Sequence, residues 1–148
     1  MIDEVEDGGV ARSVGKLLSS PTRTFAPVMK ELLENHFDAI HGLIHCSGGG
    51  QTKCLKYIPD NVRIIKDHLF EPPVIFQLLQ AASKADDREM YQVFNMGTRL
   101  EIYTNEKDAE KIISVSKSYG VDARVIGRVE EAAKTSLFIK SISGELEY

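Results

Sequence analysis

The sequence predicts an α/β or α+β domain, in which a mixed β-sheet is packed with helices and the chain ends in a β-hairpin. Segments with helical spacing of apolar residues alternate with short apolar strands along the 148 residues, and a run of strands follows at the C-terminal end. Hydrophobic residues make up 43% of the chain and charged residues 27%, the composition of an ordinary globular domain. A chain of this length forms one core without a disulfide or a structural metal ion.

The first half of the chain predicts a lead-in segment, two helices and a strand. Residues 1–19 are polar and are predicted to be the remnant of an interdomain linker, and residues 20–148 to be the domain itself. From Pro27 onward the apolar residues have helical spacing, with the proline in the first turn. Residues 41–47 are mostly apolar and run into three glycines, which predicts a buried strand, and residues 51–57 predict a short helix.

The second half predicts further strands and helices in alternation. Residues 62–66 predict a strand, Pro72–Pro73 opens a helix, and Asp86 caps the next one. Residues 99–103 alternate between polar and apolar, which predicts a strand with one buried face. The remaining predicted elements are a helix from Thr104 or Asn105 to Gly120, a strand at residues 123–129, and a hairpin of residues 137–142 and 145–148 that turns at Ser143 and Gly144.

Charge and cysteine content argue against several classes of function. Lys and Arg number 18 and Asp and Glu 22, so the net charge is −4, and the basic residues are scattered, whereas a nucleic-acid binder carries a basic patch. No apolar run is long enough to span a bilayer, and the acidic start is unlike a secretory signal. Because only Cys46 and Cys54 are present, we predict a cytoplasmic protein. The scattered basic residues and the short apolar runs predict that it has no nucleic-acid partner and no membrane partner.

The strongest local feature is the glycine turn (Ser47–Gly50), which joins a predicted strand to a predicted helix. Such a turn points free backbone N–H groups at an anion, and glycines let a ligand approach the backbone closely. The hydroxyls of Ser47 and Thr52 and the charge of Lys53 would add donors. The spacing is neither that of a Walker loop nor that of a dinucleotide-binding motif, and by itself it favours a tight turn that needs positive φ.

Two further loops offer polar groups. Residues 20–24 place three hydroxyls and the Arg23 guanidinium ahead of a helix, a chemistry suited to phosphate, although in isolation they are better explained as a helix cap with a solvated arginine. Residues 95–99 lie between a helix and a strand, where they form either a functional loop or a turn with Met96 in the core. No metal site is predicted, because the four histidines lack ligand spacing, and Cys46 is predicted to be a small buried thiol.

Four motifs in one order resemble the C-terminal half of AIR synthase, the phosphoribosylformylglycinamidine cyclo-ligase of purine synthesis. The resemblance runs from about Ser20 to the end of the chain, and its motifs are Pro21–Arg23, His41–Gly50, Met90–Gly97 and Val125–Val129. It implies a reaction in which ATP phosphorylates the formamide oxygen of formylglycinamidine ribonucleotide. A nitrogen then attacks, phosphate leaves, and the imidazole ring of aminoimidazole ribonucleotide closes.

The resemblance also implies partners and cofactors. In this family an N-terminal domain with an Asp-Gly-x-Gly-Thr-Lys signature binds most of the ATP and magnesium and pairs with its twin in a homodimer. The sequence does not contain that domain, so the chain is predicted to be a C-terminal fragment that is inactive in isolation. The alternative is a non-catalytic ligand-binding or regulatory domain of an AIR-synthase-related protein with another substrate.

The resemblance carries over to individual residues only in the loops that face the ribonucleotide substrate, and it assigns no catalytic residue and no metal ligand. The sequence departs from the commonest family pattern at Cys46–Ser47, which replaces an Ile-Thr pair, and at residues 51–54, which replace a stretch leading to Asn-x-Pro-Arg. The residues expected to contact substrate or phosphate are Thr22, Arg23, His45, Ser47, Gly48, Gly49, Gly50, Asn95, Met96 and Gly97.

Overall fold

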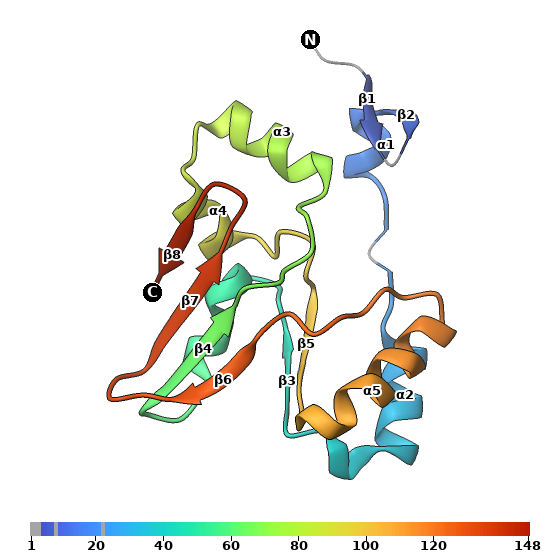
Figure 1. The fold of residues 1–148 in the computed structure, drawn as a ribbon. Coiled ribbons are helices and arrows are strands. Elements are labelled where there is room, and N and C mark those ends of the chain that lie inside the picture. Colours follow the sequence, from blue (N-terminus) through green and yellow to red (C-terminus); the bar gives the residue numbers. More distant parts are fainter. Residues whose placement is uncertain (1–3, 8, 22) are drawn as a thin grey trace.

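The computed structural model describes residues 4–7, 9–21 and 23–148 and confirms the predicted class, with helices packed on a mixed sheet (Figure 1). In the largest sheet the central strand β4 pairs in parallel with β7 and antiparallel with β6, and β7 pairs antiparallel with β8. The β7–β8 pair is the predicted terminal hairpin. The strands of this sheet, in spatial order, are β6 (Arg128–Glu131), β4 (Val62–Lys66), β7 (Ser136–Lys140) and β8 (Glu145–Glu147).

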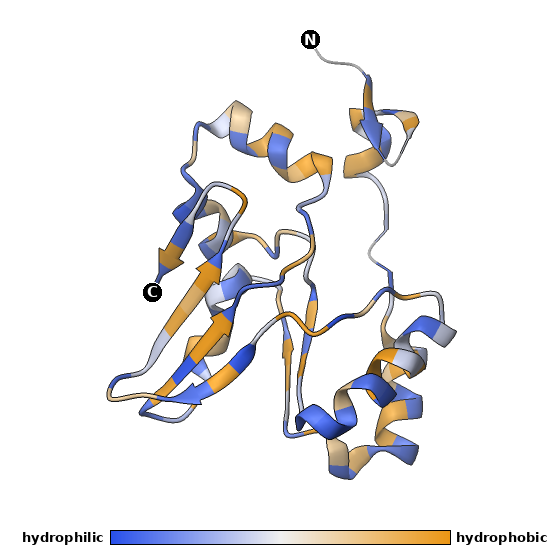
Figure 2. Ribbon diagram, viewed as in Figure 1, coloured by the Kyte–Doolittle hydropathy of each residue, from blue (hydrophilic) through white to orange (hydrophobic). Residues whose placement is uncertain are grey.

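The main core lies on one face of this sheet. Ile64 stands beside Leu137 in the parallel register and Lys66 stands beside Ile139, so these four side chains point to the same face. All four are almost fully buried, and Figure 2 shows hydrophobic residues along β4 and β7. This core also receives side chains from three short helices, namely the 3₁₀-helix η2 (Gly50–Lys56) and the α-helices α3 (Val74–Ser83) and α4 (Asp87–Val93).

A two-stranded ribbon of β3 (Gly42–His45) and β5 (Leu100–Tyr103) stands between two cores. Ile44 and its partner Glu101 face the main core, while Ile102 packs against a second, smaller one. The prediction that only one face of the strand at residues 99–103 is buried was therefore wrong, because both faces of β5 are covered. The second core is formed by α2 (Ala26–Asn35) and α5 (Glu106–Ser118), which contribute Val28, Leu32 and Ile112.

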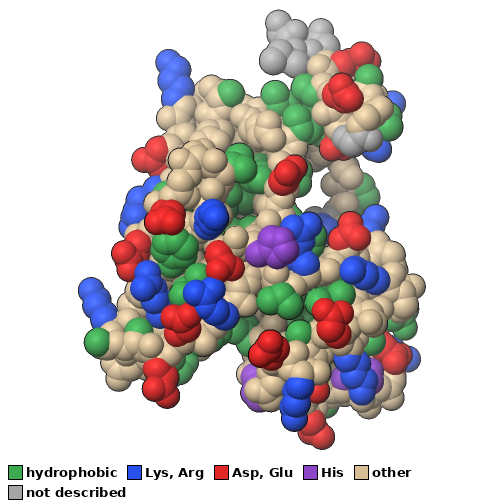
Figure 3. Space-filling model, viewed as in Figure 1, with side chains coloured by type: hydrophobic (Ala, Val, Ile, Leu, Met, Phe, Trp, Pro, Cys, Tyr) green, Lys and Arg blue, Asp and Glu red, His purple; other side chains and the backbone are tan. Residues whose placement is uncertain are grey.

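The N-terminal residues form regular structure where the sequence predicts a polar linker remnant. Strands β1 (Glu4–Asp7) and β2 (Val10–Ser13) make a hairpin, and Ser13 caps helix α1 (Val14–Leu18) by accepting a hydrogen bond from the Lys16 N–H. This unit contacts α3, and Figure 3 shows an opening in the surface directly below it in that view. The division of the chain at residues 19 and 20 stays a prediction.

Most other predicted boundaries agree with the structure, and two differ for identifiable reasons. Asp86 caps α4 as predicted, because its carboxylate accepts from the Glu89 N–H at 2.8 Å. The helical spacing that begins at Pro27 includes Phe37, but α2 ends before the short 3₁₀-helix η1 (Phe37–Ala39), so Phe37 is exposed. Strand β6 begins only after Gly127, whose backbone lies so close to β4 that an added Cβ would stand 1.8 Å from the Ile65 carbonyl oxygen.

Candidate functional site

The glycine turn connects β3 to η2, and its geometry explains two of its three glycines. Gly49 and Gly50 have φ angles of 92° and 49°, in the left-handed region that favours glycine. A Cβ atom on Gly50 would lie 2.5 Å from the Phe94 carbonyl oxygen and 2.6 Å from that of Tyr91. At Gly48 the same atom would meet nothing within 4 Å. The tight-turn explanation therefore accounts for Gly49 and Gly50, and Gly48 is left facing open space.

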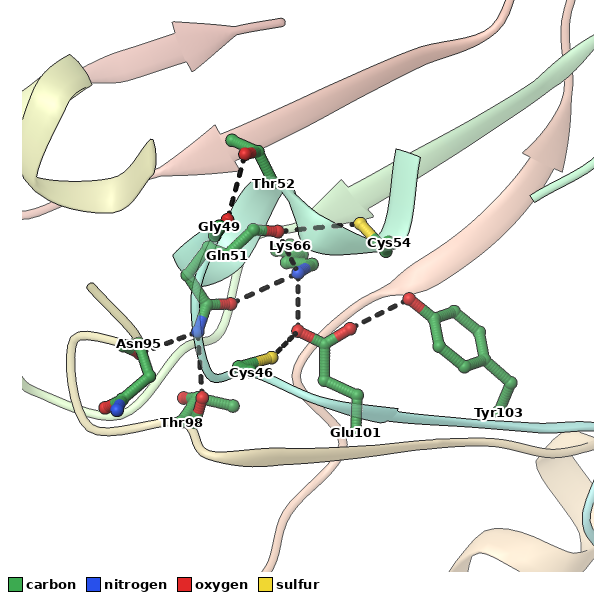
Figure 4. Close-up of polar contacts among 10 residues, drawn as sticks. All are labelled: Cys46, Gly49, Gln51, Thr52, Cys54, Lys66, Asn95, Thr98, Glu101 and Tyr103. Atoms are coloured by element: carbon green, nitrogen blue, oxygen red, sulfur yellow. Dashed lines mark hydrogen bonds and ion pairs between the residues drawn. The ribbon is translucent and has the colours of Figure 1, made fainter. Parts of the chain in front are cut away.

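The glycine turn lies directly against the Asn95 loop (Asn95–Thr98), and Gln51 holds the two together. Its Nε2 atom donates to the Asn95 carbonyl at 2.6 Å and to the Thr98 carbonyl at 2.9 Å (Figure 4). The side chain is fully buried. The structure therefore brings together two of the loops that the sequence singled out, through a residue that sequence reasoning did not include in the site.

The Asn95 loop has a strained, fixed backbone. Met96 and Gly97 both have positive φ, 48° and 97°, and the Met96 side chain is buried, as the turn interpretation predicts. Asn95 stabilises this shape by accepting the Gly97 N–H on its Oδ1 atom at 2.9 Å. Its side-chain amide points away from Gln51 in Figure 4. The nitrogen of this amide remains as a donor on the outer side of the loop.

Basic side chains lie at the end of the ribbon where the glycine turn begins. The Lys53 ammonium donates to the Ser47 hydroxyl at 2.8 Å and to the His45 carbonyl at 3.0 Å, so its charge sits over the turn. The His45 ring packs edge-on against Phe25, and the Arg99 guanidinium lies over the same phenyl ring, 5.2 Å from its centroid. Donors and positive charge at an exposed turn suit an anionic ligand.

Beneath the turn lies a buried polar network centred on an ion pair. The Lys66 ammonium and the Glu101 carboxylate are 2.5 Å apart, and each side chain is almost fully buried. Lys66 also donates to the carbonyl and side-chain oxygens of Gln51 at 2.7 and 3.1 Å. Glu101 accepts hydrogen bonds from the Cys46 thiol at 3.1 Å and from the Tyr103 hydroxyl at 2.8 Å (Figure 4). Both of these donors therefore point at the carboxylate.

This network keeps the nearby thiol and phenol protonated. Burial raises the pKa of Cys46, and the neighbouring charge and hydrogen bond of Glu101 raise it further. Burial, and then the charge of Glu101, also raise the pKa of Tyr103. Cys46 is therefore a small buried thiol, as predicted, and not an activated nucleophile.

The structure places the first predicted loop elsewhere. The Arg23 guanidinium donates to the Gly120 carbonyl at 2.7 Å, where it caps the C-terminal end of α5, so its described contact is not with the glycine turn. Thr22 lies outside the described residues. The residues that the structure does gather at the turn and the Asn95 loop are His45, Ser47, Gly48, Gly49, Gly50, Asn95, Met96 and Gly97.

Sequence reasoning missed Gln51, Lys66 and Glu101. Alternation along residues 99–103 placed Glu101 on a solvent face, and Lys66 stood at the end of a strand, where a charge is ordinary. The one sequence signal for Gln51 is its position directly after the glycine turn.

The described part of the chain has neither a cluster of metal ligands nor a membrane-spanning helix. Among residues 4–7, 9–21 and 23–148, no three His, Cys, Asp or Glu side chains are grouped so that they could hold a metal ion. Within the same residues, none of the helices has both the length and the apolar character needed to cross a membrane.

Comparison with known proteins points to one family. The family model described as "AIR synthase related protein, C-terminal domain" matches residues 2–140. Similar curated proteins include phosphoribosylformylglycinamidine cyclo-ligases of Methanocaldococcus jannaschii, 34% identical over 125 residues, and Methanopyrus kandleri, 33% identical over 129 residues. These alignments cover 84% and 87% of this chain but 35% of each relative, so the chain spans about a third of their length.

Solved structures show the same fold at lower identity. A crystal structure of Escherichia coli HypE, a hydrogenase maturation protein, matches 92% of this chain and 44% of its own, with a TM-score of 0.58 and 17% identity. A second HypE structure matches 85% of this chain with a TM-score of 0.58 and 19% identity. At this level of identity the likeness concerns the fold alone.

Proposed function

The chain belongs to the family of AIR synthase related protein C-terminal domains, and from that premise we propose that it is the C-terminal domain of a phosphoribosylformylglycinamidine cyclo-ligase. The observation that carries the proposal is the match to enzymes of that name at 31–34% identity over 84–87% of the chain. The order of the four motifs in the sequence agrees with the same assignment.

The proposed reaction closes the imidazole ring of aminoimidazole ribonucleotide at the expense of ATP. ATP and magnesium would bind mainly to an N-terminal domain of the same protein, which would also form the homodimer, in the cytoplasm. The domain described above would supply loops that close over the ribonucleotide. We assign no step of the chemistry to it, because no described side chain in the site has the geometry of a nucleophile paired with a base.

The role proposed for the glycine turn and the Asn95 loop is to hold the anionic part of the ribonucleotide. Three features support it: open space at Gly48, the Lys53 ammonium 2.8 Å from the Ser47 hydroxyl, and the outward amide of Asn95. The Arg23 guanidinium donates to the Gly120 carbonyl, so its proposed part is to fix the chain ahead of α2 by capping α5.

The test is an activity measurement on two proteins. The full-length gene product, incubated with formylglycinamidine ribonucleotide, ATP and magnesium, is expected to form aminoimidazole ribonucleotide, whereas the isolated 148-residue chain is expected to form none. A full-length protein that binds the ribonucleotide without turning it over would instead favour a ligand-binding or regulatory domain. Turnover by the isolated chain would contradict the need for a second domain.

A further inference from the structure

Gln51 has two sets of contacts that point in opposite directions. Its Nε2 atom donates to two carbonyls of the Asn95 loop, and its Oε1 atom accepts from the Lys66 ammonium. The side chain has no exposed surface, although it comes directly after a turn whose Gly48 is open to solvent. It therefore links the candidate ligand surface to the buried ion pair.

The network fixes which way round the Gln51 amide lies. The ammonium of Lys66 only donates hydrogen bonds, and the carbonyls of Asn95 and Thr98 only accept them. A flipped amide would place its NH₂ group against the ammonium and its oxygen against two carbonyl oxygens, with like partial charges facing each other. Because Glu101 holds Lys66 in place, the ion pair sets the orientation of the amide.

The amide in turn sets which groups the Asn95 loop presents outward. Both loop carbonyls that Gln51 contacts are directed inward and are satisfied, and the Asn95 Oδ1 atom is occupied by the Gly97 N–H. The Asn95 side-chain nitrogen is left as a donor on the side of the loop away from Gln51. The Thr98 hydroxyl is buried without a partner among the described residues, so Thr98 is held through its backbone and not through its side chain.

We propose that Gln51 is a positioning residue that holds the Asn95 loop in its donor-outward shape and thereby sets the affinity of the site for the anionic ribonucleotide. The choice of ligand rests on the function proposed above, but the effect on the shape of the loop does not. Gln51 does not touch the ligand in this proposal, because its side chain is buried behind the turn.

The test compares two variants of the full-length protein with a matched control. Gln51→Met keeps the length of the side chain and removes the hydrogen bonds of its amide. Gln51→Glu keeps an acceptor toward Lys66, replaces the donating nitrogen by an oxygen and adds a negative charge. The control, Tyr103→Phe, removes one hydrogen bond to the other oxygen of Glu101 and leaves every contact of Gln51 in place. All three change polar contacts in the same buried network, and the free energy of unfolding of each variant, measured in urea, shows how much of any effect follows stability.

Two measurements separate positioning from stability. Amide hydrogen exchange at Gly97 and Thr98 is expected to be at least about tenfold faster in both Gln51 variants than in Tyr103→Phe, because the loop opens without its clamp. The KM for formylglycinamidine ribonucleotide is expected to rise about tenfold or more, the scale of effect that a misplaced binding loop produces. In Tyr103→Phe we expect KM to stay within about twofold of the wild type, since the loop keeps both of its contacts with Gln51.

Each outcome has a defined meaning. Unchanged exchange at Gly97 and Thr98 in a folded Gln51 variant overturns the proposal, as does faster exchange with an unchanged KM. An equal rise in KM in Tyr103→Phe also overturns it, because the effect then follows stability. If Gln51→Met does not fold, Gln51→Glu decides. A wild-type protein that shows no turnover overturns the proposed function alone, and the positioning role is then judged by the exchange of the two amides.

Discussion

Gly50 and Phe94 are in direct backbone contact: a Cβ atom on Gly50 would stand 2.5 Å from the Phe94 carbonyl oxygen and 2.8 Å from its nitrogen. This contact joins the glycine turn to the end of α4, and from there the chain enters the Asn95 loop. The close approach of the two backbones is possible only without a side chain at position 50.

We therefore expect Gly50→Ala to destabilise the chain by about 2–4 kcal/mol, from a backbone clash combined with an unfavourable positive φ. The free energy of unfolding measured in urea checks this. Gly48→Ala is the control, because it adds the same methyl group where nothing lies within 4 Å, and it should cost under about 1 kcal/mol. Equal midpoints for the two variants would contradict the contact.

Gly48→Val tests the turn as a ligand surface. The added side chain meets no protein atom within 4 Å at its Cβ, so the fold should survive while the approach of an anion is blocked. In the full-length enzyme we expect KM for the ribonucleotide to rise about tenfold or more, since a misplaced binding group costs that much. Gly15→Val in α1, which is equally open, should leave KM unchanged. Gly49 is a poorer choice, because its φ of 92° would strain any side chain.

Removing one partner of the buried ion pair should lower the free energy of unfolding more than removing both partners. Lys66→Met leaves the Glu101 carboxylate buried without its cation, and we expect a loss of about 3–5 kcal/mol. The double variant Lys66→Met/Glu101→Leu should recover at least about half of that loss, since no unpaired charge remains. Urea denaturation of Lys66→Met, Glu101→Leu and the double variant gives the coupling energy. Additive losses would show that the two charges do not depend on each other.

Stability should fall as the pH rises above the ordinary thiol range. The folded state raises the pKa of Cys46, chiefly through burial and then through the charge of Glu101, above its ordinary value of 9.0. The contribution of this thiol is therefore complete below about pH 9 and is lost at higher pH, where the unfolded chain releases its proton, at a rate of about 1.4 kcal/mol per pH unit. Unfolding measured between pH 8 and pH 10.5 in wild type and Cys46→Ala should show the steeper fall in the wild type. Parallel curves would contradict this.

Helices and strands could be predicted from the sequence more accurately than which faces of those elements are buried. Strand β4 and the Asp86 cap depend on local patterns, and both were predicted at the right residues. The burial of Glu101 depends on the ribbon lying between two cores, which no local pattern expresses. The N-terminal hairpin was missed because its short strands alternate only weakly and its charged residues suggested a linker.

The candidate site was predicted in part, for the same physical reason. Glycines mark backbone that needs positive φ or close approach, so Gly49, Gly50 and Gly97 were visible in the sequence. That the glycine turn lies against the Asn95 loop was not visible, because it depends on Gln51 reaching across from η2 to that loop. Arg23 was assigned to the site because the resemblance carries it there and its chemistry suits phosphate, whereas in the structure it donates to a carbonyl at the end of α5.

The parallel pairing of β4 with β7 has a consequence for biosynthesis. Translation runs from the N-terminus, so Val62–Lys66 leaves the ribosome while Ser136–Lys140 has still to be made. Until β7 arrives, Ile64 and Lys66 lack the neighbours that cover them, and the sheet lacks its second central strand. Nascent chains that stall between the two strands will expose an apolar strand edge, which makes them candidates for chaperone binding and for aggregation.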